Sequence, residues 1–530
     1  MTPLLTRTLL SVLLVGCSGT QAQTAAPLAS FASAGGVTTP APLRTTIRQR
    51  IEAHMGFLAS DAMGGRETGT IEGEITAAYL ASVMRGLGLA PAGGGGLYTQ
   101  DYPLHRSQLD LDSLELSFGG AEPWAPIDDY TLRGLGAEPL DLLGEVVFAG
   151  HGVVDSESGL DQLAGLPIEG RFVAVFTGVP PGFEGLDERV HSGTKRDAVE
   201  ERGGLGLILL SGEDDKQAAR TRSWLRRSAT HARLVLGGAT ASPTSLVRVY
   251  PEPRLSEALL AAAGLDFQTE LTERAEEPMT PGLVLDGVEL TLRGEVAVDE
   301  LWAQNVAGLL PGDDPELGEE VIVVSAHMDH VGVNSEGAVH NGADDNASGT
   351  ATLLSVAETL ASRAEPLRRS VLFLAVSGEE KGLLGSEWWV KNPTLPIDSV
   401  IADINVDMVG RNDPDSVGIT PSPEHADYNT LVAQAVAAGP GVGLSVSWSA
   451  GEGKYRRRVD SYYSRSDHAN FAEKGIPVVF FFAGEHEDYH QPGDTLDKID
   501  FDKVAKVSQL VETLVASVAE ADDRPQRLVD

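Results

Sequence analysis

Histidine and acidic side chains crowd into one short stretch of the sequence, residues 326–349, which reads AHMDHVGVNSEGAVHNGADDNASG. Three of the chain's 12 histidines lie in it, together with four acids. Imidazole nitrogens and carboxylate oxygens without sulfur form a ligand set that suits zinc, with manganese or cobalt as substitutes. The stretch therefore predicts a metal site, although it does not show which of these side chains bind the metal.

Further acids and a histidine follow apolar runs elsewhere in the chain. Runs that predict buried strands end in, or lead into, His327 and Asp329, Glu379 and Glu380, Asp407, and His490. In open α/β sheets functional groups gather at the carboxyl ends of the strands, so we expect these side chains to meet. Acids placed there repel one another in a partly dry site unless cations lie between them. A single strand-end aspartate more often caps a helix, so the metal hypothesis depends on the whole set.

The elements that must position these groups alternate in type from Val321 onward. Runs such as VIVVSAH and SVLFLAV predict buried strands, and amphipathic runs such as TATLLSVAETLASR predict helices between them. This alternation predicts an α/β fold in which helices flank a mixed central β-sheet. Residues 43–125 contain two helical runs around a polar loop, ASDAMGGRETGT, and are expected to form the N-terminal part of the same domain.

Residues 126–282 differ in character from the rest of the chain. They contain short β-rich runs separated by glycine and proline turns, which predict a small inserted β-rich domain. The run LDGVELTLRGEV that follows is interpreted as a strand returning to the main body. The second part of that body is therefore expected to span residues 283–525.

The first 22 residues are typical of an export signal, with one positive charge, a short apolar core and small residues after it. Residues 14–17, LVGC, resemble a bacterial lipobox, in which Cys17 would become lipid-modified; the alternative is ordinary signal cleavage near Ala22. Residues 23–42 predict a flexible tether, because they are too poor in large apolar side chains to pack. We expect an exported protein, lipid-anchored at the cell envelope or secreted, that has no second cysteine for a disulfide.

A formal net charge of -37 argues against nucleic acid as a partner, because such a surface repels phosphate backbones. The same charge repels anionic lipid headgroups, so we expect membrane contact only through a lipid on Cys17. Nothing in the sequence indicates an oligomeric state.

Five short motifs occur in a fixed order along the chain. They are H-x-D at 327–329, G-x-x-D with S-G at 342–349, E-E at 379–380, N-x-D-M at 405–408 and Y-H at 489–490. This ordered set resembles the clan MH zinc aminopeptidases, which include secreted bacterial leucyl aminopeptidases, aminopeptidase Y and glutamate carboxypeptidase. The resemblance implies a two-zinc exopeptidase that acts on peptides with a free N-terminus, with a protease-associated domain at 126–282.

The resemblance also assigns roles residue by residue. It gives one zinc to His327 and Asp407, gives the other to Glu380 and His490, and makes Asp345 the bridge, with Asp344 as the alternative bridge. A water between the two ions would attack the peptide bond while Glu379 acts as general base. Asp329 would orient the imidazole of His327, and the hydroxyl of Tyr489 would stabilise the oxyanion. The peptide bond between Asp345 and Asn346 is expected to be cis.

Substrate-binding residues are less sharply indicated. The resemblance places Arg465 and Asp467 near the substrate, whereas the residues alone are equally typical of a helix start capped by Ser466 or Asp467.

Three other functions remain open. A carboxypeptidase of the glutamate type would bind the substrate carboxylate through a basic pocket, for which residues 454–465, KYRRRVDSYYSR, are the candidate. Glutaminyl cyclases share the fold but work with one metal, and the transferrin receptor keeps the architecture without the catalytic apparatus. The complete ligand set disfavours the cyclase, and the presence of Glu379 disfavours the non-catalytic binding protein.

Overall fold

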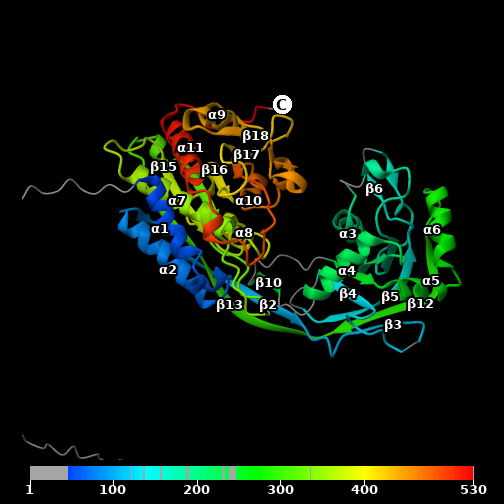
Figure 1. Cartoon of the computed structure of the whole chain (residues 1–530). Helices are drawn as coiled ribbons and strands as arrows, with labels where there is room; N and C mark the ends of the chain where they lie inside the picture. Colours follow the sequence, from blue (N-terminus) through cyan, green and yellow to red (C-terminus); the bar gives the residue numbers. More distant parts are fainter. Residues whose placement is uncertain are drawn as a thin grey trace, which may run out of the picture. The chain divides into compact units, whose positions relative to one another are not determined.

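Ten strands of the described chain form one mixed sheet, shown in Figure 1. The computed structural model describes residues 46–528, apart from 121, 135–137, 156–157, 187–189, 229–232, 238–245 and 335. The expected export signal with Cys17 and the tether at 23–42 lie outside the described residues. Among the residues described, no helix has both the length and the apolar character needed to cross a membrane.

Four neighbouring strands in the middle of this sheet are parallel, and they carry the predicted site at their carboxyl ends. Register places His327 opposite Val376 and Asp407 opposite Phe482, so the functional strands end at the same edge. In sheet order the strands are β10 (Arg233–Leu236), β2 (Thr99–Leu109), β13 (Val296–Leu310), β15 (Ser370–Val376), β14 (Val321–His327), β16 (Val400–Asp407), β21 (Val478–Phe482), β17 (Ser416–Thr420) and β18 (Ser445–Ser447), with β1 (Ala90–Pro91) paired to β13.

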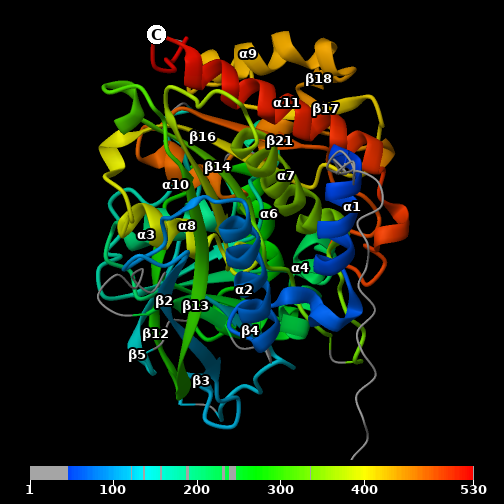
Figure 2. The ribbon, with the colours of Figure 1, turned by 90° about the vertical axis from the view of Figure 1, so that its left-hand side faces the viewer.

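Helices cover both faces of the sheet because its central strands are apolar on both sides. Ile322 and Val324 face one core cluster, and Val321 and Val323 face another. The first cluster is covered by α1 (Ile47–Leu58), α2 (Ile71–Gly86), α7 (Gly349–Ala361), α9 (Thr430–Ala438) and α11 (Phe501–Glu520), of which α1, α7 and α11 lie side by side in Figure 2. The second is covered by α8 (Leu384–Lys391) and α10 (His468–Glu473).

A second sheet of seven strands has its own apolar core. In order its strands are β3 (Glu115–Phe118), β12 (Leu283–Gly294), β5 (Leu140–Phe148), β8 (Phe172–Phe176), β9 (Gly206–Leu210), β11 (Val247–Pro251) and β4 (Tyr130–Arg133). Its helices are α3 (Ser192–Glu200), α4 (Lys216–Ser228), α5 (Pro253–Ala261) and α6 (Phe267–Glu276). Two-stranded pairs are formed by β6 (Val154–Asp155) with β7 (Leu160–Asp161) and by β19 (Ser449–Ala450) with β20 (Arg457–Arg458).

The second sheet extends beyond the expected insert at 126–282. Both β3 and β12 lie outside those bounds, and the interpretation of β12 as a strand of the main body is wrong. The strand pairs with β3 and β5, and its residues Leu290 and Leu292 pack with Phe118 and Phe148. Its continuation, β13, is the strand that enters the first sheet. Conversely, β10 lies within the expected insert bounds yet pairs with β2 of the first sheet.

Candidate metal centre

His327 and Asp407 lie together at the carboxyl ends of adjacent strands. His327 is the last residue of β14 and Asp407 the last of β16, and these strands are parallel neighbours. Nε2 of His327 lies 3.2 Å from Oδ1 of Asp407 and 3.4 Å from Oδ1 of Asp345. These three side chains are buried, and their ligand atoms lie close enough together to hold one metal ion.

The other oxygen of Asp345 faces a second group. Nε2 of His490 lies 3.2 Å from Oδ2 of Asp345 and 2.9 Å from Oε2 of Glu380. Asp345 reaches both groups from the segment between β14 and α7, where the bond to Asn346 is cis, as predicted. The structure thus brings all five predicted ligands together around the shared carboxylate of Asp345.

The structure also brings His330 into the second group, which the sequence did not indicate. Nδ1 of His330 lies 2.7 Å from Oε1 of Glu380 and 3.7 Å from Oδ2 of Asp345. His330 is fully buried, whereas the side chain of His490 is 37% exposed. The position of His330 in the HMDH stretch was visible, but spacing alone could not distinguish it from His327. The second group therefore has two candidate imidazoles.

Acidic neighbours dominate the electrostatics of both groups. Burial by itself lowers the pKa of His327, but Asp407 and Glu379 outweigh it and hold that pKa well above its usual value. At His490 burial again lowers the pKa, but the carboxylates beside it outweigh burial and raise the pKa to about 11. Protons on the imidazoles offset the carboxylate charge, and divalent cations at the same place would offset it more strongly. A set of imidazole and carboxylate ligands without sulfur fits zinc.

Asp329 lies behind His327, where it can orient the imidazole. Nδ1 of His327 is 3.2 Å from the carbonyl oxygen of Asp329 and 3.7 Å from its carboxylate. The carboxylate also accepts a hydrogen bond of 3.3 Å from the backbone N–H of Glu379. Asp329 thereby contacts both the ligand and the predicted base, as expected for a supporting residue.

Glu379 and Tyr489 line a pocket that also includes Asp345 and Asp407 of the cluster. Burial raises the pKa of Glu379 well above its usual range. His327 lowers this pKa in part, whereas the carboxylates of Glu380 and Asp407 raise it further. Burial and the nearby carboxylates also raise the pKa of Tyr489, so its hydroxyl keeps its proton. The ring of Tyr489 stacks on that of His490 with centroids 3.9 Å apart. Apolar side chains form the rest of one wall, namely Met408, Tyr462, Phe480 and Phe482.

The two predicted substrate-binding residues occupy different environments. Arg465 lines the pocket, lies over the ring of Tyr462 and has Nη1 3.2 Å from Oε1 of Glu485. Asp467 does not line it: this side chain is completely buried and accepts a hydrogen bond of 2.6 Å from Ser386. Asp467 is the residue before α10, as expected of a helix start, but its side chain makes no capping hydrogen bond; its place near the substrate stays a prediction.

Ser466 occupies the position in the pocket that was predicted for its neighbour. Its hydroxyl donates a hydrogen bond of 3.0 Å to Oδ2 of Asp407. The backbone turns into α10 at this point, and consecutive side chains of a helical turn point in directions about 100° apart. The residue types of this stretch indicate a place near the substrate, but they do not show which residue faces the ligands.

Asp344 lies outside both ligand groups. Its Oδ1 accepts a hydrogen bond of 2.6 Å from the backbone N–H of Gly410, and its Oδ2 lies 3.3 Å from Nε2 of His486. The backbone N–H groups of Asp344 and Asp345 both donate to Asp494, which is fully buried. This geometry favours Asp345 as the bridge.

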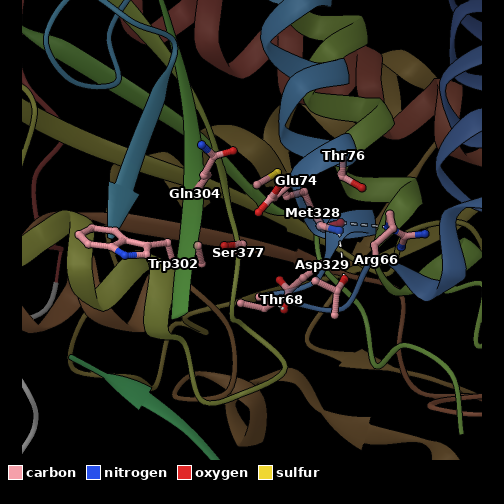
Figure 3. A pocket seen from close by; sticks show the side chains of 13 residues that line it. Arg66, Thr68, Glu74, Thr76, Trp302, Gln304, Met328, Asp329 and Ser377 are labelled. Carbon is pink, nitrogen blue, oxygen red and sulfur yellow. Dashed lines mark hydrogen bonds between the residues drawn. The ribbon is translucent and has the colours of Figure 1, made fainter. Parts of the chain in front are cut away.

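The polar loop before α2 contacts the residues that follow His327, and Figure 3 shows Arg66 and Thr68 beside Met328 and Asp329. The guanidinium of Arg66 is buried and donates to the carbonyl oxygens of Met328 and Gly342, each at 3.0 Å. The hydroxyl of Thr68 donates to Oδ2 of Asp329 at 2.9 Å. The sequence placed these residues in a loop and did not predict the contacts, which join residues more than 250 positions apart.

Comparison with known proteins agrees with this geometry. Residues 305–515 match the model of peptidase family M28. A probable leucine aminopeptidase of Arthroderma otae is 28% identical over 225 residues, which cover 40% of this chain and 57% of that protein. Aminopeptidase YwaD of Bacillus subtilis is 26% identical over 256 residues, covering 46% and 52%. The chain thus spans little more than half the length of these curated relatives.

One solved structure resembles almost the whole chain. The aminopeptidase from Aneurinibacillus sp. strain AM-1 has a TM-score of 0.53 and 20% sequence identity, covering 91% of this chain and 95% of that one. This likeness confirms the predicted fold class, a mixed sheet flanked by helices.

Proposed function

We propose that the protein is a zinc-dependent aminopeptidase whose two metal sites share Asp345, a proposal supported by the match of residues 305–515 to the model of peptidase family M28. The observation that carries the proposal is the placement of this one carboxylate between two imidazoles. Its Oδ1 lies 3.4 Å from Nε2 of His327 and its Oδ2 lies 3.2 Å from Nε2 of His490. A carboxylate shared in this way can hold two cations close together.

The residues of the chain have separate tasks in the proposed reaction. When bound, zinc ions would supply Lewis acidity and make a water acidic enough to attack at neutral pH. Glu379 takes the proton of the attacking water at its carboxylate and delivers it to the leaving amine. Its place in the pocket beside the ligand Glu380 supports this task, because a general base must lie within reach of the attacking water. The protonated hydroxyl of Tyr489 lines the same pocket and donates to the developing oxyanion.

The charge of the pocket supports an aminopeptidase over a carboxypeptidase. The cationic group that lines it, Arg465, is paired with Glu485, and Arg458 of the basic stretch is paired with Glu424 and Asp460. A substrate carboxylate in this pocket would therefore meet an arginine that already has an acidic partner, in a site rich in acids. A free N-terminal ammonium group is the complementary charge.

Hydrolysis of a matched substrate panel tests this function. We expect release of nitroaniline from leucyl-p-nitroanilide, none from its N-acetyl derivative, and loss of turnover with a chelator that zinc restores. Hydrolysis of N-acetylated peptides with a free C-terminal glutamate would instead identify a carboxypeptidase. Cyclisation of N-terminal glutamine with one bound metal would identify a cyclase, and absence of any turnover at saturating zinc would favour the binding protein.

We also propose that the protein is exported and carries a lipid on Cys17. The sequence of residues 1–22 supports this proposal through its charge, its apolar core and its lipobox-like LVGC. Expression in a lipoprotein-processing bacterium with labelled fatty acid should label the wild-type chain and not the Cys17→Ser variant. A wild-type chain that is exported without label would contradict the lipid anchor.

A further inference from the structure

The hydroxyl group of Thr68 makes two hydrogen bonds to separate loops of the metal centre. It donates to Oδ2 of Asp329 at 2.9 Å and accepts from the backbone N–H of Gly378 at 2.8 Å. Thr68 is only 4% exposed, so water does not readily replace either partner. A hydroxyl has a single proton to donate, and here it is directed to the carboxylate, which leaves a lone pair for the amide.

Each of these partners leads directly to a group of the proposed reaction. The second oxygen of Asp329 accepts from the backbone N–H of Glu379 at 3.3 Å and lies 3.7 Å from Nδ1 of His327. Gly378 immediately precedes Glu379. The hydrogen bonds therefore form a closed ring through Thr68, Asp329, Glu379 and Gly378, which joins the loop after β14 to the loop after β15.

Thr68 is itself held firmly against both loops. The neighbouring side chain of Glu67 is paired with Lys381, with Oε1 and Nζ 2.7 Å apart. Arg66 donates to the carbonyl oxygens of Met328 and Gly342, and the approach of Gly65 is so close that a Cβ there would lie 2.5 Å from the carbonyl oxygen of Gly332. The loop can therefore fix the position of the hydroxyl and does not merely follow the metal loops.

From this geometry we propose that Thr68 is a positioning residue, whose hydroxyl sets the orientation of Asp329 and holds Glu379 and Glu380 in place relative to His327. The inference rests on the proposed metal function and adds a residue from the N-terminal part of the chain to it. Thr68 acts on the chemistry through Asp329 and the backbone of Gly378, since neither His327 nor Glu379 contacts its side chain directly. Partners of this kind usually change metal affinity or activity by ~10–100-fold.

Zinc binding by full-length Thr68→Val and Thr68→Ser variants tests the proposal. Valine keeps the shape and removes both hydrogen bonds, whereas serine keeps the hydroxyl. We expect the zinc dissociation constant of Thr68→Val, measured by competition with a chromophoric chelator, to rise ~10–100-fold. With zinc saturating, its kcat should fall by a similar factor while KM changes little, and Thr68→Ser should recover most of both losses.

Thr76→Val is the matched control. Thr76 is also buried, lines the same cavity as Thr68 and donates its hydroxyl proton to the carbonyl oxygen of Glu72 within α2. Its replacement should leave zinc affinity and kcat unchanged. Equal losses in Thr76→Val, equal losses in Thr68→Ser, or unchanged zinc affinity in Thr68→Val would each overturn the proposal.

A double-mutant cycle with Asp329→Ala separates positioning from general destabilisation. If Thr68 acts through Asp329, Thr68→Val should add less than about 2-fold to the loss of zinc affinity in the Asp329→Ala background. Fully additive losses would contradict the ring of hydrogen bonds. Zinc affinity is measured without turnover, so a wild-type protein that binds zinc but cleaves no peptide would refute the proposed function and leave this inference standing.

Discussion

The two sheets of the molecule contain similar runs of parallel strands, but they differ in the side chains that follow those strands and in the partners of those side chains. In the first sheet, β15, β14, β16 and β21 lead into the candidate metal ligands, and the ion-pair partners of Asp345, Glu380 and Asp407 among the described residues are histidines, not lysines or arginines. In the second, β5, β8, β9 and β11 lead into groups that basic residues contact. Glu252, directly after β11, lies 3.0 Å from Nε of Arg222 and 2.9 Å from Nη2 of Arg226.

The difference is visible in one histidine of each region. His490 of the first sheet has its pKa raised to about 11 by carboxylates that outweigh burial. His151, after β5 of the second sheet, has its pKa lowered to about 4 by burial and by Lys195. Parallel strands alone therefore do not make a metal centre. The candidate metal groups combine buried carboxylates with histidines, and among the described residues they occur only at the first sheet.

Removing the shared carboxylate should have the largest effect. We expect Asp345→Asn to lower zinc affinity at both sites by more than ~100-fold, since loss of even a supporting residue costs ~10–100-fold. The matched variant is Asp344→Asn, whose amide oxygen can still accept from the N–H of Gly410. Bound zinc counted after gel filtration distinguishes the two. Loss of zinc from Asp344→Asn with retention in Asp345→Asn would reverse the assignment of the bridge.

Glu379→Gln should separate catalysis from metal binding within the first region. We expect kcat for an aminoacyl-nitroanilide to fall by ~10²–10⁴-fold, the usual range for loss of a general base, with zinc content unchanged. Glu387→Gln is the control, because Glu387 forms an ion pair with Lys391 one helical turn away on α8. If Glu379→Gln retained wild-type kcat, another group would have to be the base.

In the second sheet, loss of a strand-end partner should affect stability and not zinc. Arg222→Met removes a side chain that is 7% exposed and leaves Glu252 with Arg226 alone. We expect the free energy of unfolding to fall by ~1–3 kcal/mol, from thermal or urea unfolding, with zinc content as in wild type. Arg293→Met, which breaks an exposed pair with Asp141, should leave stability close to that of wild type. Loss of zinc from Arg222→Met would show that the two regions are not independent.

The two histidines should give opposite pH trends, which are the smallest of these effects. In zinc-depleted protein His490 has a raised pKa, so its stabilising contribution is complete below pH 6.5 and disappears as the pH rises toward about 11. His151 has a lowered pKa, so its contribution is complete above pH 6.5 and disappears as the pH falls toward about 4.

Unfolding midpoints of His490→Gln and His151→Gln, compared with wild type across this pH range, measure the two trends. The difference between wild type and each variant should shrink toward alkaline pH for His490 and toward acid pH for His151. Zinc should abolish the His490 trend, because a ligated imidazole is neutral. The same sign of trend in both variants would contradict the electrostatic contrast between the regions.

Much of the site could be predicted because its residues follow strongly apolar runs. His327 and Asp407 end buried strands, and parallel strands end at one edge, so their meeting followed from pattern alone. The choice of Asp345 and the cis bond after it came from the resemblance of five ordered motifs. The capping hydrogen bond expected of Asp467 is not formed, because its buried carboxylate accepts a hydrogen bond from Ser386 on another helix. The sheet to which β12 belongs was predicted wrongly, because an alternating pattern indicates a strand but does not indicate its partner strand.

The sequence by itself determined the donor chemistry, the acidic balance and the alternation of strands and helices, because these depend on residue types and local period. Only the tertiary structure decided that His330 joins Glu380, that Ser466 contacts Asp407, and that Thr68 joins two metal loops. These contacts link residues 50 to 310 positions apart. Such contacts depend on how whole elements pack, and no local spacing encodes the distance between two side chains on different elements.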